Sequence, residues 1–401
     1  MYRYLNRLII SDAFKDRKIA FITGPRQCGK TTMAKDILEV GRQSENYFNW
    51  DDQDFQLMWL RNPNDIINRL KPGQDDSSWL VLDELHKFKN WKNTLKGLFD
   101  LYQDKARMMV TGSARLETYR KTGDSLAGRY RLYRLHPFSF NEKPEIPAPP
   151  DGKKWFERTM DKTFDLDSLL TLGGFPEPLL GGSKEKADRW WRLYKDQIVR
   201  DDLRDIKSFR EINMISAAAN LLAEKAGGTL SVQSIQEDLK VSFATANDWI
   251  EALCAVYFGF VIRPYAKSIK GALHKEPKFY LYNYAAVKNN GARLENLFAC
   301  HLLKACNIWT DAAFGEFELK YIKDKYKREV DFVVLKNSKP WLLLEVKSSP
   351  HQPTDALLFY SQLMKPRFTV QVGQIMGQER TFHAENNEIE LLSAEAFLSQ
   401  L

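Results

Sequence analysis

The residues best suited to carry chemistry in this 401-residue sequence lie between positions 18 and 32. Gly24 is followed by four residues and then by Gly29, Lys30 and Thr31, which fits the Walker A pattern of a phosphate-binding loop. In such a loop, backbone N–H groups and the start of the next helix bind phosphate oxygens. The apolar run at 19–23 and the helix-forming residues after Thr32 supply the required strand and helix. We predict that the loop binds ATP through Gly24, Pro25, Arg26, Gln27, Cys28, Gly29, Lys30, Thr31 and Thr32.

Two acids downstream would complete a hydrolytic site. Residues 79–82 are apolar and are followed by Asp83 and Glu84, the Walker B arrangement of a buried strand that ends in carboxylates. Lys30 is expected to contact the β- and γ-phosphates, Thr31 and Asp83 to hold Mg²⁺, and Glu84 to orient and deprotonate the attacking water. An apolar run followed by two acids usually marks only a strand that meets solvent. Its combination with the phosphate loop predicts ATP hydrolysis.

Two further residues are candidates for the same reaction. Ser113 follows a predicted strand at 107–111 and would place a hydroxyl beside the γ-phosphate, although a helix N-cap explains it equally well. Arg129 follows Gly128 in a region where oligomeric ATPases often carry an arginine finger for a neighbour's site. Such a finger stabilises charge in the transition state.

The order of predicted elements indicates an α/β fold with a parallel sheet around the phosphate loop. Four prolines interrupt residues 141–153, which we interpret as a linker or exposed loop, and a helical pattern follows, expected to form a lid. The predicted division is an ATPase core at 1–140, a linker at 141–153, a helical lid at 154–228, a winged helix at 229–285 and a restriction-endonuclease-like domain at 286–401.

The winged helix is predicted from two short helices that precede two aromatic strands. Ser231 is a good N-cap for the first helix, and the strands at 257–265 and 277–282 are joined by a basic loop. Residues 258–280 contain five basic side chains against one acid. The second helix, however, carries Asp248 and Glu251 and no Lys or Arg, which disfavours reading of DNA bases. Docking within the chain or to another protein is therefore favoured, and DNA binding stays an alternative.

A second group of acidic residues lies in the last predicted domain. Asp331 precedes Glu345 and Lys347 on two consecutive predicted strands, which fits the Asp…Glu-x-Lys pattern of restriction-endonuclease-like sites. The two-residue period of a strand puts Glu345 and Lys347 on one face. Two carboxylates would hold Mg²⁺, Lys347 would activate water, and Glu295 on a preceding helix would complete the site. The alternative is charged residues on a hairpin in a fold kept only as a scaffold.

Several of these motifs together resemble a known family. The segments at 24–32, 82–87, 111–113, 126–129, 135–140 and 173–178 occur in the order and spacing of prokaryotic, archaeal-type ATPases of the AAA superfamily, which carry a C-terminal domain of unknown function. The resemblance extends nearly to the C-terminus. It implies an additional-strand P-loop ATPase core, a cytoplasmic location and self-association.

Composition is consistent with a globular protein that has several domains. The net charge of +7 permits contact with nucleic acid without requiring it. No apolar run is long enough to cross a membrane, and the first residues lack the apolar core of a secretion signal, so a cytoplasmic protein without membrane contact is expected. The scattered cysteines are expected to be reduced, and the six histidines to be surface or capping residues.

The favoured hypothesis is a Mg²⁺-dependent ATPase that rearranges its C-terminal domains. One alternative is a DNA-processing nuclease that ATP regulates. The other is a non-catalytic adaptor that ATP switches and that binds a protein partner through the winged helix.

Overall fold

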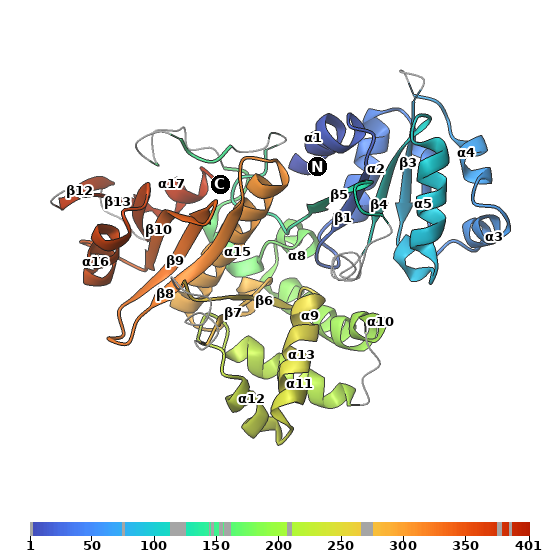
Figure 1. Cartoon of the computed structure of the whole chain (residues 1–401). Helices are drawn as coiled ribbons and strands as arrows, with labels where there is room; N and C mark the ends of the chain where they lie inside the picture. The colour runs from blue at the N-terminus through green and yellow to red at the C-terminus, as the bar shows by residue number, and fades with distance from the viewer. Residues whose placement is uncertain are drawn as a thin grey trace. The chain divides into compact units, whose positions relative to one another are not determined.

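The computed structural model describes residues 3–73, 77–112, 126–143, 145, 148–151, 155, 162–206, 211–265, 276–374, 379–384 and 387–401. The chain forms two compact units, of which the first comprises Met1–Pro137 and Lys143–Ile146 and the second comprises Phe138–Glu142 and Pro147–Leu401. Figure 1 shows the elements of both units. Each unit has α/β architecture, and the predicted α/β fold is confirmed at this level.

The first unit alternates helices and strands from its N-terminus. Its described elements are α1 (Tyr4–Ile9), η1 (Ile10–Phe14), β1 (Ile19–Thr23), α2 (Lys30–Val40), η2 (Ser44–Asn46), β2 (Tyr47–Asn49), α3 (Gln53–Arg61), α4 (Asp65–Arg69), β3 (Ser78–Asp83), η3 (Leu85–Lys87), α5 (Trp91–Tyr102), β4 (Ala106–Thr111) and β5 (Tyr130–Arg134). The strands expected at 19–23, 79–82 and 107–111 therefore all form.

The strands of this unit form one parallel sheet. Within the described residues its order is β2-β3-β4-β1-β5, so β4 lies between the phosphate-loop strand β1 and the acid-bearing strand β3. The register places Thr111 beside both Ile22 and Asp83, and Asn49 beside Asp83. All carboxyl ends therefore meet at one edge, where the residues after β1 and β3 can act together.

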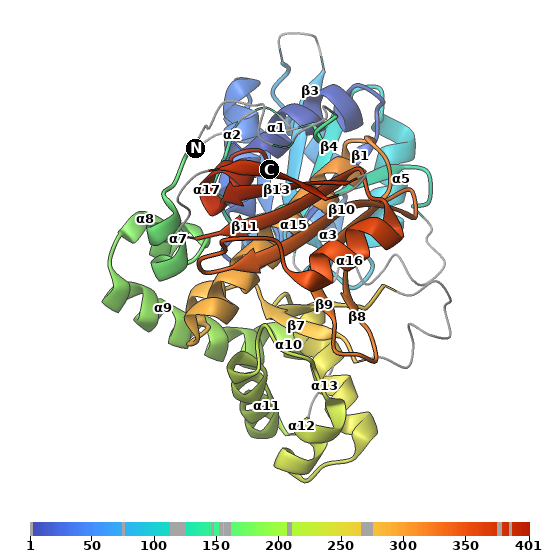
Figure 2. The same cartoon turned by 90° about the vertical axis from the view of Figure 1, so that its left-hand side faces the viewer.

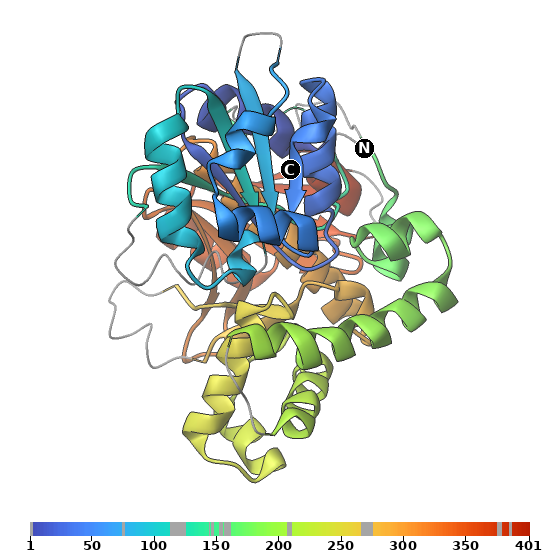
Figure 3. The same cartoon turned by 90° about the vertical axis from the view of Figure 1, so that its right-hand side faces the viewer.

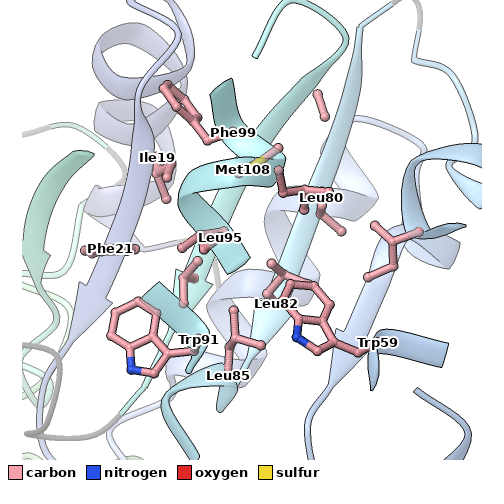
Figure 4. Close-up of a cluster of buried hydrophobic side chains, with 14 of the residues drawn as sticks. Ile19, Phe21, Trp59, Leu80, Leu82, Leu85, Trp91, Leu95, Phe99 and Met108 are labelled. Atoms are coloured by element: carbon pink, nitrogen blue, oxygen red, sulfur yellow. The ribbon is translucent and has the colours of Figure 1, made fainter. Parts of the chain in front are cut away.

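Helices cover both faces of this sheet, with α2 on one side and α5 on the other (Figure 3). The α5 face forms a cluster of buried aromatic and aliphatic side chains, including Phe21, Trp59, Leu82, Trp91 and Leu95 (Figure 4). Alternate residues of β1 serve the two faces, since Ile19 and Phe21 join this cluster whereas Ala20 and Ile22 do not. Burial of each large side chain contributes roughly 1.5–3 kcal/mol, which fixes the strands that carry the site.

The second unit begins with helices and ends with a mixed sheet. Its described elements are α7 (Leu166–Leu172), α8 (Pro176–Gly181), α9 (Lys184–Gln197), η5 (Ile198–Asp202), α10 (Leu203–Ile206), α11 (Ile212–Glu224), α12 (Val232–Leu239), α13 (Phe243–Ala255), β6 (Gly259–Ile262), β7 (Lys278–Leu281), η6 (Tyr284–Ala286), α15 (Asn290–Asp311), β8 (Phe317–Lys323), β9 (Glu329–Lys336), β10 (Lys339–Lys347), α16 (Asp355–Met364), β11 (Phe368–Gly373), β12 (Arg380–Ala384), β13 (Asn387–Ser393) and α17 (Ala394–Leu398).

The mixed sheet has the strand order β12-β13-β11-β10-β9-β8 within the described residues. β8, β9 and β10 are antiparallel neighbours, whereas β11 pairs parallel with β10 after the crossover through α16. α15 and α16 lie on opposite sides of this sheet (Figure 2). β6 and β7 form a separate antiparallel pair after α12 and α13.

The beginning of the predicted linker is packed rather than exposed. Glu142 is buried and forms an ion pair with the buried Lys304 of α15. Lys304 also donates to Ser139 Oγ at 2.7 Å, and the Phe140 N–H donates to His301 Nε2 at 3.0 Å. The proline pattern did not reveal this, because the partners lie about 160 residues further along the chain.

Two smaller expectations have opposite outcomes. The prediction that all histidines are surface or capping residues is wrong, since His86, His136 and His301 are buried. The four cysteines do have free thiols, as expected. Among the described residues no helix is long and apolar enough to cross a membrane.

Candidate nucleotide site and a buried carboxylate cluster

The loop between β1 and α2 has the backbone that a phosphate cradle requires. Gly24 has φ +146°, and a Cβ built there would lie 2.1 Å from the Leu135 carbonyl oxygen. Gly29 precedes α2 with φ +98°. Only glycine adopts these conformations without strain, which lets the backbone approach a ligand closely.

Lys30 is the first residue of α2, and its ammonium lies within the loop. The side chain is buried, and Nζ donates to the carbonyl oxygens of Gly24 at 3.0 Å and Pro25 at 2.7 Å. The positive charge is therefore held beside the backbone that would surround the phosphates.

Asp83 ends β3 as a buried carboxylate with three hydroxyl donors. Its Oδ2 accepts from Thr31 Oγ1 at 2.8 Å and from Tyr47 OH at 2.6 Å, while its Oδ1 accepts from Thr111 Oγ1. The structure thus brings together Thr31 and Asp83, the two predicted metal ligands. Hydroxyl and carboxylate oxygens are the donors that Mg²⁺ prefers, so the residues present fit a magnesium ion.

Glu84 directly follows Asp83 in a left-handed conformation, with φ +58°. Burial raises the pKa of its carboxyl group, and the positive charges of Lys30 and Lys87 oppose this shift. Non-glycine residues with positive φ are often found at functional sites, and a raised pKa suits a general base. Both features are compatible with the predicted role of Glu84.

The two further candidates for the ATPase reaction have different outcomes. Ser113 lies outside the described residues. Arg129 lies at the opposite edge of the sheet, where its carbonyl oxygen accepts from the N–H of Ile19, the first residue of β1. Its guanidinium donates to Asp100 Oδ1 at 2.6 Å. The length of β1, about 16 Å, separates Arg129 from the phosphate loop of its own subunit, so an action in cis is excluded.

Tyr47 and Thr111 were not identified from sequence. Both lie on strands next to β3, and their hydroxyls hold the Asp83 carboxylate. Only the register of the sheet brings them to Asp83, and the sequence alone does not give that register.

The residues of the second predicted site, Asp331, Glu345 and Lys347, also lie close together. Glu345 and Lys347 lie on β10, and Glu345 Oε1 is 2.6 Å from Lys347 Nζ. Asp331 on β9 accepts from the Val346 N–H at 2.8 Å. Burial, followed by the charge of Asp331, raises the pKa of Glu345 to about 7. Burial also raises the pKa of Asp331.

Glu295 reaches this cluster from α15, but its partners were not predicted. Its Oε1 accepts from Lys278 Nζ at 2.9 Å and from Tyr280 OH at 2.7 Å. Lys278 also lies 2.5 Å from Glu329 Oε1 and 3.8 Å from Asp331 Oδ1. We refer to Glu295, Glu329, Asp331 and Glu345 together as the carboxylate cluster.

Lys278 was counted in the basic excess of residues 258–280, but it is not part of an exposed basic surface. Its side chain is buried, and carboxylates surround its ammonium, so it cannot contact a DNA phosphate. The other lysines of the segment, Lys267, Lys270 and Lys275, lie outside the described residues. Within the described residues no group of three or more His, Cys, Asp or Glu side chains is placed to hold a metal ion.

Comparison with known proteins identifies two segments. Residues 16–143 match the family model of an AAA domain, and residues 163–289 match the model of a domain of unknown function (DUF8612). An uncharacterized protein of Methanocaldococcus jannaschii is 23% identical over 80% of this chain and 73% of its own length. An uncharacterized protein of Mycobacterium tuberculosis is 23% identical over 66% of this chain. The match covers 54% of that protein's own length, so this chain spans about half of it.

Solved structures give a weaker likeness. AMPPCP-bound DnaA from Aquifex aeolicus has 16% identity and a TM-score of 0.30, with 62% of this chain and 87% of that chain covered. PCH-2 of C. elegans has 14% identity and a TM-score of 0.22, with coverage of 62% and 65%. TM-scores this low do not define a common overall fold. The family match places similarity to AAA domains in residues 16–143, the segment that contains the phosphate loop, Asp83 and Glu84.

Proposed function

We propose that this chain is a Mg²⁺-dependent ATPase of AAA type. The observation that carries the proposal is the contact between Thr31 and Asp83, because it joins the Walker A and Walker B segments at one edge of a parallel sheet. The match of residues 16–143 to AAA domains supports the same function.

Each residue has a distinct role in this proposal. The loop at 24–32 binds the phosphates through its backbone, and Lys30 neutralises charge on them. Thr31 and Asp83 hold Mg²⁺, which would neutralise the charge that develops on the phosphates. Glu84 orients the attacking water and accepts its proton. Ser113 and Arg129 stay candidates, Ser113 as a sensor and Arg129 as a finger that acts on a neighbouring subunit.

Two substitutions test the function. Lys30→Ala is expected to abolish ATP binding, whereas Glu84→Gln is expected to bind ATP and to lose hydrolysis. Lys89→Ala is a control, because Lys89 is exposed and lies just beyond the acids. ATP binding is measured with a fluorescent analogue and turnover by phosphate release, with and without single-stranded, duplex and branched DNA. Unchanged turnover in Glu84→Gln would contradict the proposal.

We further propose that hydrolysis rearranges the segments after residue 140, with residues 154–228 as a helical lid. The Glu84→Gln protein is expected to hold ATP and to show a protease cleavage pattern different from that of the nucleotide-free protein. The same pattern with and without ATP would contradict the rearrangement and would leave hydrolysis untouched.

A metal-dependent nuclease is the second candidate. Two observations support it. Asp331, Glu345 and Lys347 lie close together on the adjacent strands β9 and β10. The elements around them follow one another along the chain in the order α15-β8-β9-β10-α16-β11, and β11 is parallel to β10. Cleavage of plasmid or branched DNA with Mg²⁺ or Mn²⁺ must then disappear in Lys347→Ala. If neither hydrolysis nor cleavage occurs while ATP still strengthens the binding of a protein partner, the adaptor function is supported instead.

A further inference from the structure

Lys278, the first residue of β7, lies among three members of the carboxylate cluster. Its ammonium lies 2.5 Å from Glu329 Oε1, 2.9 Å from Glu295 Oε1 and 3.8 Å from Asp331 Oδ1. The Tyr321 ring lies on a further side, with its centroid 5.5 Å from Nζ. The Lys278 side chain is only 4% exposed. Three carboxylates from two elements thus converge on one buried positive charge.

A metal ion held by Asp331 would lie close to this ammonium, which is 3.8 Å from Asp331 Oδ1. Buried carboxylates require a cation, and an ammonium and a divalent ion cannot both occupy the centre of such a small cluster, because they repel each other. In the part of the chain that the structure describes, no group of acids is placed to hold a metal ion. This is consistent with an arrangement in which the acids surround Lys278 instead. Burial lowers the pKa of Lys278, but the surrounding carboxylates outweigh burial and raise it.

A second observation concerns the carboxylate that would bind an ion if Lys278 were removed. Glu345 is 4% exposed, and its Oε2 has no hydrogen-bond partner within the described residues, although Oε1 pairs with Lys347. An unpaired buried carboxylate oxygen is costly. It is, however, a ready ligand for a metal ion.

Lys278 is held in place by contacts between β7 and α15. Tyr280 OH donates to Glu295, and the Leu281 N–H and carbonyl oxygen both bond to the Asn296 side chain, at 2.9 Å and 2.8 Å. These bonds fix the strand in register with the helix that supplies Glu295. The lysine is therefore a constant part of this arrangement rather than a mobile surface side chain.

From this geometry we infer that Lys278 is the resident cation of the carboxylate cluster, and that Mg²⁺ or Mn²⁺ binds at Asp331 and Glu345 only when Lys278 is removed. The inference concerns the site of the second candidate function and rests on that proposal only for the identity of the metal ligands; if it is correct, the wild-type chain has no metal-dependent cleavage at this site. It predicts that the chain as it stands does not bind a divalent ion there.

The test counts Mn²⁺ ions bound to the nucleotide-free full-length chain by electron paramagnetic resonance. Wild type and Asp331→Asn are expected to bind the same number of ions. Lys278→Met is expected to bind one ion more than wild type at the same Mn²⁺ concentration. The double variant Lys278→Met/Asp331→Asn is expected to lose that ion again.

Lys320→Met is the matched control, because Lys320 on β8 pairs with Glu318 at 2.5 Å on the same sheet but outside the cluster. It should gain no ion. Lys278→Met that folds without gaining an ion would overturn the inference, as would a wild-type ion that disappears in Asp331→Asn.

If Lys278→Met does not fold, the comparison of wild type with Asp331→Asn still decides, since equal binding supports exclusion and a lost ion contradicts it. DNA cleavage is assayed separately on the same proteins. An ion gained without cleavage supports the role of Lys278 and contradicts the nuclease function, so the two failures are distinguishable.

Discussion

At the scale of single residues, two glycines of the first unit have opposite requirements. A Cβ at Gly24 would lie 2.1 Å from the Leu135 carbonyl oxygen, whereas one at Gly97 on α5 would meet no atom within 4 Å. We expect Gly24→Ala to displace the phosphate loop at a cost of roughly 1–3 kcal/mol and to weaken ATP binding at least tenfold. Gly97→Ala is expected to stabilise α5 by up to about 1 kcal/mol. ATP titration and thermal unfolding of both variants check this, and equal ATP affinities would contradict it.

The hydroxyl of Tyr47 should set the Mg²⁺ requirement. It donates to the same Asp83 oxygen as Thr31, and it thereby orients the carboxylate. Loss of a group that orients a metal ligand typically weakens metal affinity roughly 10- to 100-fold, so Tyr47→Phe is expected to need about tenfold more Mg²⁺ for half-maximal hydrolysis. Tyr326→Phe, at an exposed tyrosine, is the control. An unchanged Mg²⁺ dependence in Tyr47→Phe would show that the hydroxyl does not orient Asp83.

Sequence could identify residues that lie within motifs, but not those that join a site from elsewhere. Lys30, Thr31, Asp83 and Glu84 are readable because short-range spacing alone fixes their backbone. Lys278 gives no such signal. It begins an aromatic strand next to a basic segment. Only its burial among carboxylates distinguishes it from a surface lysine.

At the scale of elements, strands and helices with strong apolar patterns were predicted and their long-range packing was not. Residues 19–23, 79–83 and 341–347 all lie within strands, because each carries enough buried side chains to determine its conformation. The segment at 138–142 has no such pattern and is held by Lys304 and His301 instead. Those partners are specified by tertiary structure alone.

The contact of this segment with α15 makes a prediction about pH. His301 Nε2 accepts from Phe140 N–H, so the ring proton is on Nδ1, which donates to the Leu297 carbonyl oxygen at 2.8 Å. Burial lowers the pKa of His301 to about 4, below the ordinary value of 6.5. Because the unfolded chain binds the proton first, stability is complete above pH 6.5 and is lost as pH falls towards 4, by up to about 3 kcal/mol.

Chemical denaturation between pH 7.5 and 4.5 measures this loss. His301→Gln is expected to flatten the pH dependence, and His383→Gln is the control, because the His383 side chain is 72% exposed. If His301→Gln keeps the full pH dependence of wild type, other groups cause it.

At the scale of the whole molecule, the position of Arg129 makes it possible to test whether hydrolysis depends on assembly. Arg129 and the phosphate loop lie at opposite edges of the sheet, so Arg129 can serve only the nucleotide of another subunit. If it is a finger, Arg129→Ala should bind ATP normally and lose turnover by roughly 10³-fold or more. Mixing it with Lys30→Ala should restore turnover, because one variant keeps an intact ATP site and the other keeps an intact Arg129.

The pair Lys30→Ala and Glu84→Gln is the control for this mixture. Neither of those variants has a complete ATP site, so a mixed assembly cannot recover. If turnover recovers when Arg129→Ala is mixed with Lys30→Ala but not in this control mixture, the finger must act between subunits. If Arg129→Ala alone hydrolyses ATP at the wild-type rate, Arg129 only holds Asp100 at the edge of the sheet, where its guanidinium donates at 2.6 Å. Such an exposed ion pair contributes little to stability, and its loss would leave hydrolysis unchanged.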